Sequence, residues 1–266
     1  MRSALKALTP PLLWSLGKVL QRKVLEAQGK VQAPFKPEAR HGRFAFENQA
    51  SFYSLYNDYF INERYKFECG TKRPLIIDGG ANIGISCRYW KDLYPEAEVL
   101  AFEPDEKNFV LLQKNVKGLT NITAENKALW SSHGVLKFKA VGGEGGHVAN
   151  AKSHAGKDQI VKVPSFRLRD LLNRKVDLLK LDIEGSEMEV LRDCKDLLGN
   201  VEKIFVEHHS FLGQPQQLGE LFGILETAGF RINIHVDIVS QQPFIKRTVF
   251  NNKDCWINIF AFRETK

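Results

Sequence analysis

The stretch Leu75-Ile76-Ile77-Asp78-Gly79-Gly80-Ala81-Asn82-Ile83-Gly84 is a short apolar run that leads directly into a glycine-rich turn. The apolar residues are typical of a buried strand, and an amphipathic helix is expected to follow over residues 84–93. In a parallel α/β sheet, such a turn lies at the carboxyl edge, where these folds bind their ligands. Glycine also lets the backbone approach a ligand closely. The stretch therefore predicts an α/β domain with a ligand-binding turn.

The same turn indicates which cofactor it binds. A dinucleotide-binding turn would read G-x-G-x-x-G, but the matching positions here are Gly79, Ala81 and Gly84, so the middle glycine is missing. The strand ends in Asp78, whose carboxylate would repel a pyrophosphate and attract an amino group or a sulfonium. These features favour S-adenosylmethionine over a nicotinamide cofactor. The contacts expected from this turn are Asp78, Gly79, Gly80, Asn82 and Gly84.

Two later strand ends complete the predicted cofactor site. Glu103 follows the apolar run Val99–Phe102 and lies 19 residues after Gly84, where an acid can accept hydrogen bonds from both ribose hydroxyls. The alternative for Glu103 is a role at the dipole of the next helix. Pro104 is expected beside it. A third strand, predicted over 122–129, brings Asn126 and Ala128 to the adenine, unless the side chain of Asn126 serves only the turn.

The rest of the chain repeats short apolar strands and helices. Strands are predicted at 99–102, 122–129, 176–181 and 204–206, and helices at 105–117, 186–198 and 215–228. This rhythm predicts a doubly wound, mostly parallel sheet with helices on both faces. Two final strands, at 230–236 and 256–262, have no helix between them and predict an antiparallel hairpin at the sheet edge. We expect a helical N-terminal extension over residues 1–70 and a Rossmann-like domain over residues 71–266.

The net charge of +7 is concentrated at the N-terminus, because residues 1–30 carry six Lys or Arg and one acid. A nucleic-acid binder would spread its basic residues over the working domain, so no nucleic-acid partner is expected. The segment is amphipathic and has no apolar run long enough to span a bilayer. It is expected to dock on the catalytic domain or a second subunit, as in a homo-oligomer, or to contact an anionic inner membrane face. Four scattered cysteines predict a reducing, cytoplasmic location.

The ends of two more strands carry the residues expected at the acceptor. Asp182 ends one strand, and Glu207 and His208 end the next, so all should reach the cofactor edge. Asp182 and Glu207 are candidate ligands for a hard cation such as Mg²⁺, or His208 acts as a base without metal. Glu184 is a further candidate that could instead serve the helix dipole. Ser186 with Glu189 is expected to cap the helix, and His209 is expected to be structural. Lys180 should pair with an acid such as Asp182 or Glu184.

These segments together resemble the FkbM family of methyltransferases. The resemblance is carried by Asp78–Gly84, Phe102–Pro104, Asn126–Leu129, Leu179–Glu187 and the segment Phe205–His209, and it covers roughly residues 70–210. It implies a class I methyltransferase fold, S-adenosylmethionine as cofactor, and O-methylation of a hydroxyl on a sugar, glycan or related small acceptor. The alternatives are an N- or carboxyl-methyltransferase of the same fold, a nucleic-acid methyltransferase, a nicotinamide oxidoreductase and a non-enzymatic binding protein. The acidic turn after Asp182 argues against nucleic acid.

Overall fold

A computed structural model of the chain describes residues 42–140, 147–148, 159–237, 240–250 and 252–264. The basic segment within residues 1–30 therefore lies outside the described residues. The glycine-rich segment 142–158, whose composition is typical of a loop, also lies largely outside them. Residues from Phe44 onward form one compact unit that contains the sheet. The unit includes the aromatic segment before residue 70, which packs onto the sheet through Tyr65 and Phe205.

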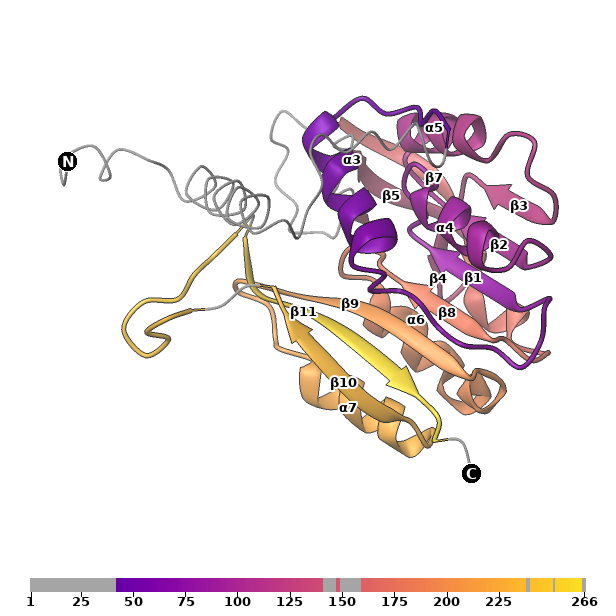
Figure 1. Ribbon diagram of the computed structural model, residues 1–266. Coiled ribbons are helices and arrows are strands. Elements are labelled where there is room, and N and C mark those ends of the chain that lie inside the picture. Colours follow the sequence, from indigo (N-terminus) through magenta and orange to yellow (C-terminus); the bar gives the residue numbers. More distant parts are fainter. Residues whose placement is uncertain (1–41, 141–146, 149–158, 238–239, 251, 265–266) are drawn as a thin grey trace, which may run out of the picture. The chain divides into compact units, whose positions relative to one another are not determined.

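The central sheet has seven strands in the order β10-β11-β9-β8-β1-β2-β3 (Figure 1). The pairs from β3 to β9 are parallel, whereas β11 runs antiparallel to both β9 and β10. The predicted doubly wound sheet with an antiparallel edge is confirmed. Its strands are β1 (Leu75–Gly79), β2 (Glu98–Phe102), β3 (Ile122–Glu125), β8 (Leu178–Leu181), β9 (Lys203–Phe211), β10 (Arg231–Val236) and β11 (Lys253–Phe262).

Helices cover both faces of this sheet (Figure 1). One face carries α4 and α5 together with the N-terminal α3 and the π-helical turn η2, and the other carries α6 and α7. Asp105 caps α5, because its carboxylate accepts from the backbone N–H groups of Lys107 and Asn108. The bounds are α3 (Gln49–Tyr56), η2 (Asn57–Ile61), α4 (Ile85–Leu93), α5 (Glu106–Val116), α6 (Glu187–Cys194) and α7 (Leu218–Thr227), with 3₁₀ turns η3 (Leu168–Leu171) and η4 (Lys195–Asn200).

Alternation along the central strands separates an apolar face from a polar one. Leu179 and Val206 belong to the core that these strands form with α6 and α7. On the opposite face, neighbouring strands carry Asp78, Lys180 and Glu207, with Asp78 directly beside Lys180 in the register. The polar groups that the sequence places near strand ends thus gather on one face of the sheet.

A second, smaller sheet changes one prediction. The strand expected over 122–129 is two strands, since β3 ends at Glu125 and β4 (Ala128–Trp130) belongs to a separate sheet of order β4-β7-β5-β6. Asn126 marks the break, because its Nδ2 donates to the backbone carbonyls of Glu103 (2.8 Å) and Pro104 (3.2 Å). The other strands of this sheet are β5 (Gly134–Ala140), β6 (His147–Val148) and β7 (Gln159–Arg167).

Aromatic side chains before β1 cover the polar face of the sheet. The rings of Tyr59 and Tyr65 stack with centroids 4.2 Å apart, and Tyr65 meets the ring of Phe205 on β9 at 4.8 Å. Burial raises the pKa of Tyr59 well above its usual value, and the nearby charges of Asp78 and Asp182 raise it further. The segment before β1 therefore closes over the same groups that the strands bring together.

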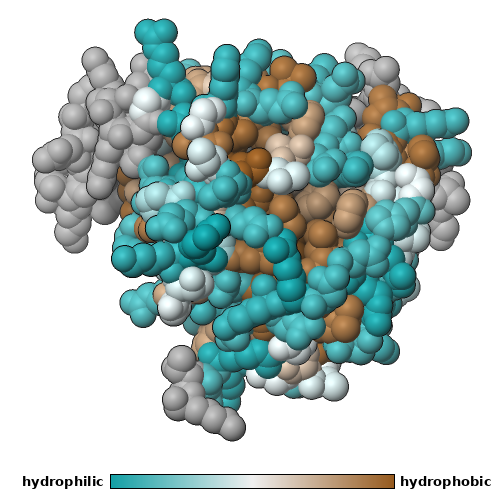
Figure 2. All heavy atoms as spheres, turned by 90° about the vertical axis from the view of Figure 1, so that its right-hand side faces the viewer, coloured by the Kyte–Doolittle hydropathy of each residue, from teal (hydrophilic) through white to brown (hydrophobic). Residues whose placement is uncertain are grey.

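The surface is mixed in character. Figure 2 shows hydrophobic side chains toward the middle of one face, with hydrophilic side chains around them. Within the described ranges, no helix combines the length and the apolar character that crossing a membrane requires.

Candidate active site

The turn after β1 is shaped by the chain end that lies beside it. Gly80 has φ +76°, and a Cβ atom there would lie 1.9 Å from the backbone oxygen of Asp182. A side chain at this position would be strained and would collide with the backbone. The glycine expected to make room for a ligand is thus also required for the close approach of β1 to the end of β8.

Asp78 and Lys180 form a buried ion pair under this turn. The Lys180 Nζ lies 3.2 Å from Asp78 Oδ1 and 3.4 Å from Asp182 Oδ2. It also donates to the backbone oxygens of Gly79 and Gly80. The predicted pairing of Lys180 with Asp182 is confirmed. Burial lowers the pKa of Lys180, but the charges of Asp78 and Asp182 outweigh burial and leave it above its usual value.

Asp78 was expected to contact the cofactor, but its carboxylate lies buried beneath the turn. Its side chain is fully buried, and its second oxygen accepts from the Ser86 hydroxyl at 2.5 Å. Asp78 therefore acts on the turn through Lys180, which holds the two glycine carbonyls in place.

Glu103 organises the second part of the cofactor site. Its Oε2 accepts from the backbone N–H of Asn82 (2.8 Å), and its Oε1 accepts from that of Asp105 (2.9 Å). Burial raises the pKa of Glu103 to about 7, although these two N–H groups act in the opposite direction. A carboxylate has about four acceptor positions, so two remain for a ligand such as a ribose diol. Asn126 donates to the backbone oxygens of Glu103 and Pro104, whereas Ala128 is buried in β4.

The turn from β8 to α6 is held by an acid that the sequence did not single out. Glu187 is buried, and its Oε1 accepts from the backbone N–H groups of Ile183 and Gly185, both at 3.1 Å. The expected capping box is wrong: Ser186 makes no side-chain cap, and Glu189 accepts from the Ser131 hydroxyl instead. Glu187 replaces that box because its carboxylate reaches back into the turn that carries Glu184.

The burial of Glu187 predicts a pH-dependent stability. Burial raises its pKa to about 7 from an ordinary value of 4.5, although His209 and two backbone N–H groups counteract burial. A raised pKa means that Glu187 binds its proton more tightly in the folded state than in the unfolded state. The stabilisation that this proton gives is fully present below pH 4.5 and is lost as the pH rises through 7. As the pH rises from 4.5 to 8, the free energy of unfolding, measured with urea, should fall by up to ~3 kcal/mol more in the wild-type protein than in Glu187→Gln.

The control for this prediction is Glu189→Gln, which changes an exposed acid of the same helix. It should keep the pH dependence of the wild-type protein. Equal pH dependence in wild type and Glu187→Gln would show that Glu187 does not carry the effect.

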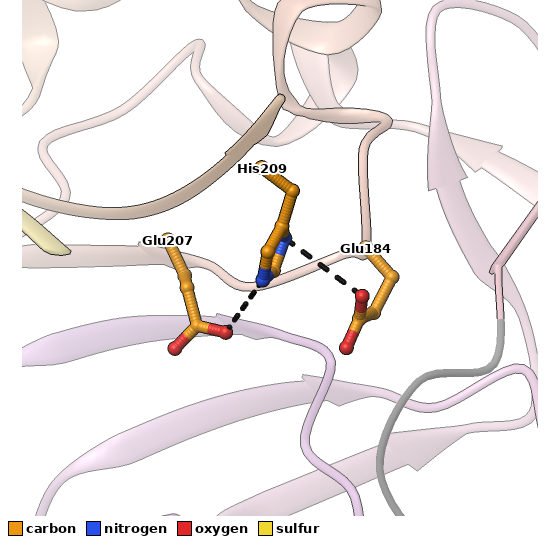
Figure 3. A group of neighbouring side chains, drawn as sticks. All are labelled: Glu184, Glu207 and His209. Carbon is orange, nitrogen blue, oxygen red and sulfur yellow. Dashed lines mark ion pairs between the residues drawn. The ribbon is translucent and has the colours of Figure 1, made fainter. Parts of the chain in front are cut away.

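Glu184, Glu207 and His209 form the acidic end of the site (Figure 3). His209 Nε2 lies 3.0 Å from Glu207 Oε1, and His209 Nδ1 lies 3.8 Å from Glu184 Oε2. One ligand atom from each residue lies within 4.8 Å of the others. Burial, together with the charges of Asp182 and Glu184, raises the pKa of Glu207 well above its usual value. Burial lowers the pKa of His209, although the charge of Glu184 acts in the opposite direction.

The histidine of this site is His209, and the expectation for His208 is corrected. Residues 207 and 209 share one face of β9, whereas His208 points to the other face. His208 pairs in register with Ile257, which belongs to the apolar core of α6 and α7. Burial, with the neighbouring His209, lowers the pKa of His208 to about 4. Alternation showed that one histidine would face the site but did not show which one.

The predicted metal pair of Asp182 and Glu207 is not the group that the structure assembles. Asp182 lies at ion-pair distance from Lys180, and the three clustered ligand groups come from Glu184, Glu207 and His209. The Nζ of Lys253 on β11 lies 2.7 Å from Glu184 Oε2. An ammonium already bonded to one of the three ligands does not fit a divalent ion in the same place. Glu184 thus pairs with Lys253 and not with Lys180.

The sequence profile of the family described as "Methyltransferase FkbM domain" matches residues 78–232. Methyltransferase sdnD of Sordaria araneosa is 30% identical over 214 residues, which cover 67% of this chain and 82% of that protein. The 2-O-methyltransferase NoeI of Sinorhizobium fredii is 26% identical over 153 residues, 51% of this chain and 63% of that one.

A structure described as Methyltransferase FkbM from Methylobacillus flagellatus KT aligns with a TM-score of 0.47 and 16% identity, over 77% of this chain and 47% of that one. The family profile includes the candidate residues from Asp78 to His209, whereas Tyr59 and Lys253 lie outside it.

Proposed function

The chain belongs to the FkbM methyltransferase domain family and is a methyltransferase, and we propose that it moves a methyl group from S-adenosylmethionine to a hydroxyl of a sugar, glycan or related small acceptor. The observation that carries the proposal is the Glu207–His209 pair on β9, which only β8 separates from β1 and its glycine-rich turn. A hydroxyl needs help in losing its proton, and this pair supplies a proton acceptor beside the cofactor edge.

The residues of the turn fit S-adenosylmethionine. Glu103 offers two unused acceptor positions to a ribose, and Gly79–Gly84 gives a backbone surface with small side chains. When bound, this cofactor supplies an electrophilic methyl group on a positively charged sulfur. Five carboxylates lie around this edge, against the two ammonium groups of Lys180 and Lys253; they belong to Asp78, Glu103, Asp182, Glu184 and Glu207. The excess of negative charge favours a sulfonium over a pyrophosphate.

Glu207 is the proposed general base. Its side chain is 13% exposed, whereas the side chain of His209 is fully buried behind it. Burial raises the pKa of Glu207 well above its usual value, which makes the ionised carboxylate a stronger base. We assign His209 a positioning role, because its Nε2 holds Glu207 Oε1 at 3.0 Å. The acceptor hydroxyl would give its proton to Glu207, and the bound cofactor would supply the methyl group, its sulfur keeping the electron pair of the broken carbon–sulfur bond.

A groove on the same sheet face supports a neutral polar acceptor. It has a volume of about 370 Å³ and combines aromatic, amide and basic groups from Asn62, Arg64, Asn233, His235, Phe260 and Phe262. His235 and Asn258 continue the row of Glu207 across β10 and β11. An aromatic face with amide donors and acceptors matches the chemistry of a sugar, which has apolar ring faces and hydroxyl edges. An extended glycan on this face would bring its far end to the groove.

The test is methyl transfer from labelled S-adenosylmethionine to a panel of acceptors. The panel contains neutral oligosaccharides, small alcohols, amines, carboxylic acids and RNA. We expect label in the oligosaccharides or small alcohols and none in RNA. Label confined to amines or carboxylic acids would replace this proposal by the N- or carboxyl-methylating alternative.

A further inference from the structure

A β-bulge in β11 selects the side chain that faces the acidic cluster. Trp256 lies opposite His209 and Cys255 lies opposite Ser210, but the next paired residue is Lys253, opposite Phe211. In an uninterrupted ladder, Asp254 would take that place on the face of His209. The bulge skips one residue and so exchanges an aspartate for a lysine at the site.

The Lys253 side chain is buried against its partners. It is 8% exposed, its Nζ bonds Glu184 Oε2 at 2.7 Å, and it lies 4.9 Å from the centre of the Trp256 ring. The contact with the aromatic face further stabilises a cation there. Asp254 is turned away, and its Oδ2 lies 3.4 Å from Nη1 of Arg247.

The geometry of the cluster suits one cation. Glu184, Glu207 and His209 each place a ligand atom within 4.8 Å of the others, which is close enough to surround a single ion. The Glu184 oxygen nearest to His209 is Oε2, and the same atom bonds Lys253. A divalent ion on that oxygen would meet the ammonium at contact distance, and the two positive charges would repel each other in a buried site.

We propose that the Lys253 ammonium, bonded to Glu184, is the resident cation of this site and keeps a divalent ion out of the place between Glu184, Glu207 and His209. The site then works without a divalent metal and gains affinity for one only when Lys253 loses its charge. Lys253 is a positioning residue, since it bonds Glu184 and not the acceptor. The consequence for methyl transfer rests on the proposed function, whereas the consequence for metal binding does not.

Mn²⁺ binding, measured by electron paramagnetic resonance on the full chain, tests this proposal. Lys253→Met should bind one Mn²⁺ roughly 10–100-fold more tightly than wild type, and adding Glu207→Gln to it should remove that binding. Lys253→Arg keeps the charge and should behave as wild type, as should the exposed control Lys246→Met. Lys253→Gln serves as the second uncharged variant if Lys253→Met does not fold.

Wild-type methyl transfer should also be unchanged by a chelator. Tight binding of one Mn²⁺ to wild type, lost in Glu184→Gln, would overturn the proposal, and so would unchanged Mn²⁺ affinity in both folded uncharged variants. Mn²⁺ binding is measured without any acceptor. Failure to find methyl transfer would therefore count against the proposed function and would not affect the conclusion on metal binding.

Discussion

The Glu207→Gln variant is expected to lose roughly 10²–10⁴ in kcat, the usual contribution of a general base. Glutamine keeps the size of the side chain and an oxygen that faces His209, but it cannot take the proton of the acceptor hydroxyl. Binding of S-adenosylhomocysteine should remain as in wild type, because Glu103 and the glycine-rich turn are untouched. The measurement is steady-state methyl transfer together with calorimetric titration.

His208→Leu is the matched control for this variant. Leucine suits the apolar face on which His208 lies, so methyl transfer should stay within a few-fold of wild type. A near-normal kcat in Glu207→Gln, or a loss of activity confined to a well-folded His208→Leu, would remove Glu207 from its assigned role.

Lys180→Met is expected to destabilise the folded protein by about 3–5 kcal/mol, the cost of removing one partner of a buried ion pair. Asp78 is fully buried and would lose the ammonium that lies 3.2 Å from its Oδ1. The carbonyls of Gly79 and Gly80 would lose their donor at the same time. Urea unfolding at pH 7 measures the change, and S-adenosylhomocysteine should bind the remaining folded protein more weakly.

Lys175→Met provides the comparison for Lys180→Met. Lys175 is paired with Glu202 at 3.3 Å, but its side chain is 66% exposed, so its loss should cost less than ~1 kcal/mol. Similar small losses in both variants would mean that the ion pair under the turn contributes little to folding.

The fold was predictable because its signals are local. Short apolar runs, each followed by a helix, identify strands of a parallel sheet that is covered on both faces. The turn at Asp78–Gly84 and the acid at Glu103 follow such runs directly, so sequence spacing placed them at one edge. The antiparallel edge followed from two strands without a helix between them.

The acidic end of the site was harder to predict, because it depends on facing and register. Sequence alternation places His208 and His209 on opposite faces of β9 but does not show which residue lies on which face. The pairing of β9 with β8 and β11 determines this. Lys253 reaches the site through a bulge, which shifts the alternation of β11 by one residue. The long side chains of Glu187 and Tyr59 arrive from a helix and from the covering segment, and no spacing rule links them to the strands.

The ion pair of Asp78 with Lys180 was also not predicted from the sequence. A carboxylate at the end of a strand has the same sequence signal whether it meets a ligand or a neighbouring lysine. The signal that could have distinguished them was Lys180 itself, a charged residue inside an apolar strand that needs a buried acid beside it. Read together, the two residues predict a pair, and the pair removes Asp78 from the surface.

Calorimetric titration of the full chain with S-adenosylhomocysteine, with NAD as the parallel control, decides whether this edge of the sheet is a methyl-donor site. We expect one molecule of S-adenosylhomocysteine to bind with micromolar affinity and NAD not to bind. A folded Glu103→Ala variant should bind at least about tenfold more weakly, because it lacks the acceptor for the ribose hydroxyls. Binding of NAD in place of S-adenosylhomocysteine, or equal affinity in the Glu103→Ala variant, would show that the cofactor site has been assigned wrongly.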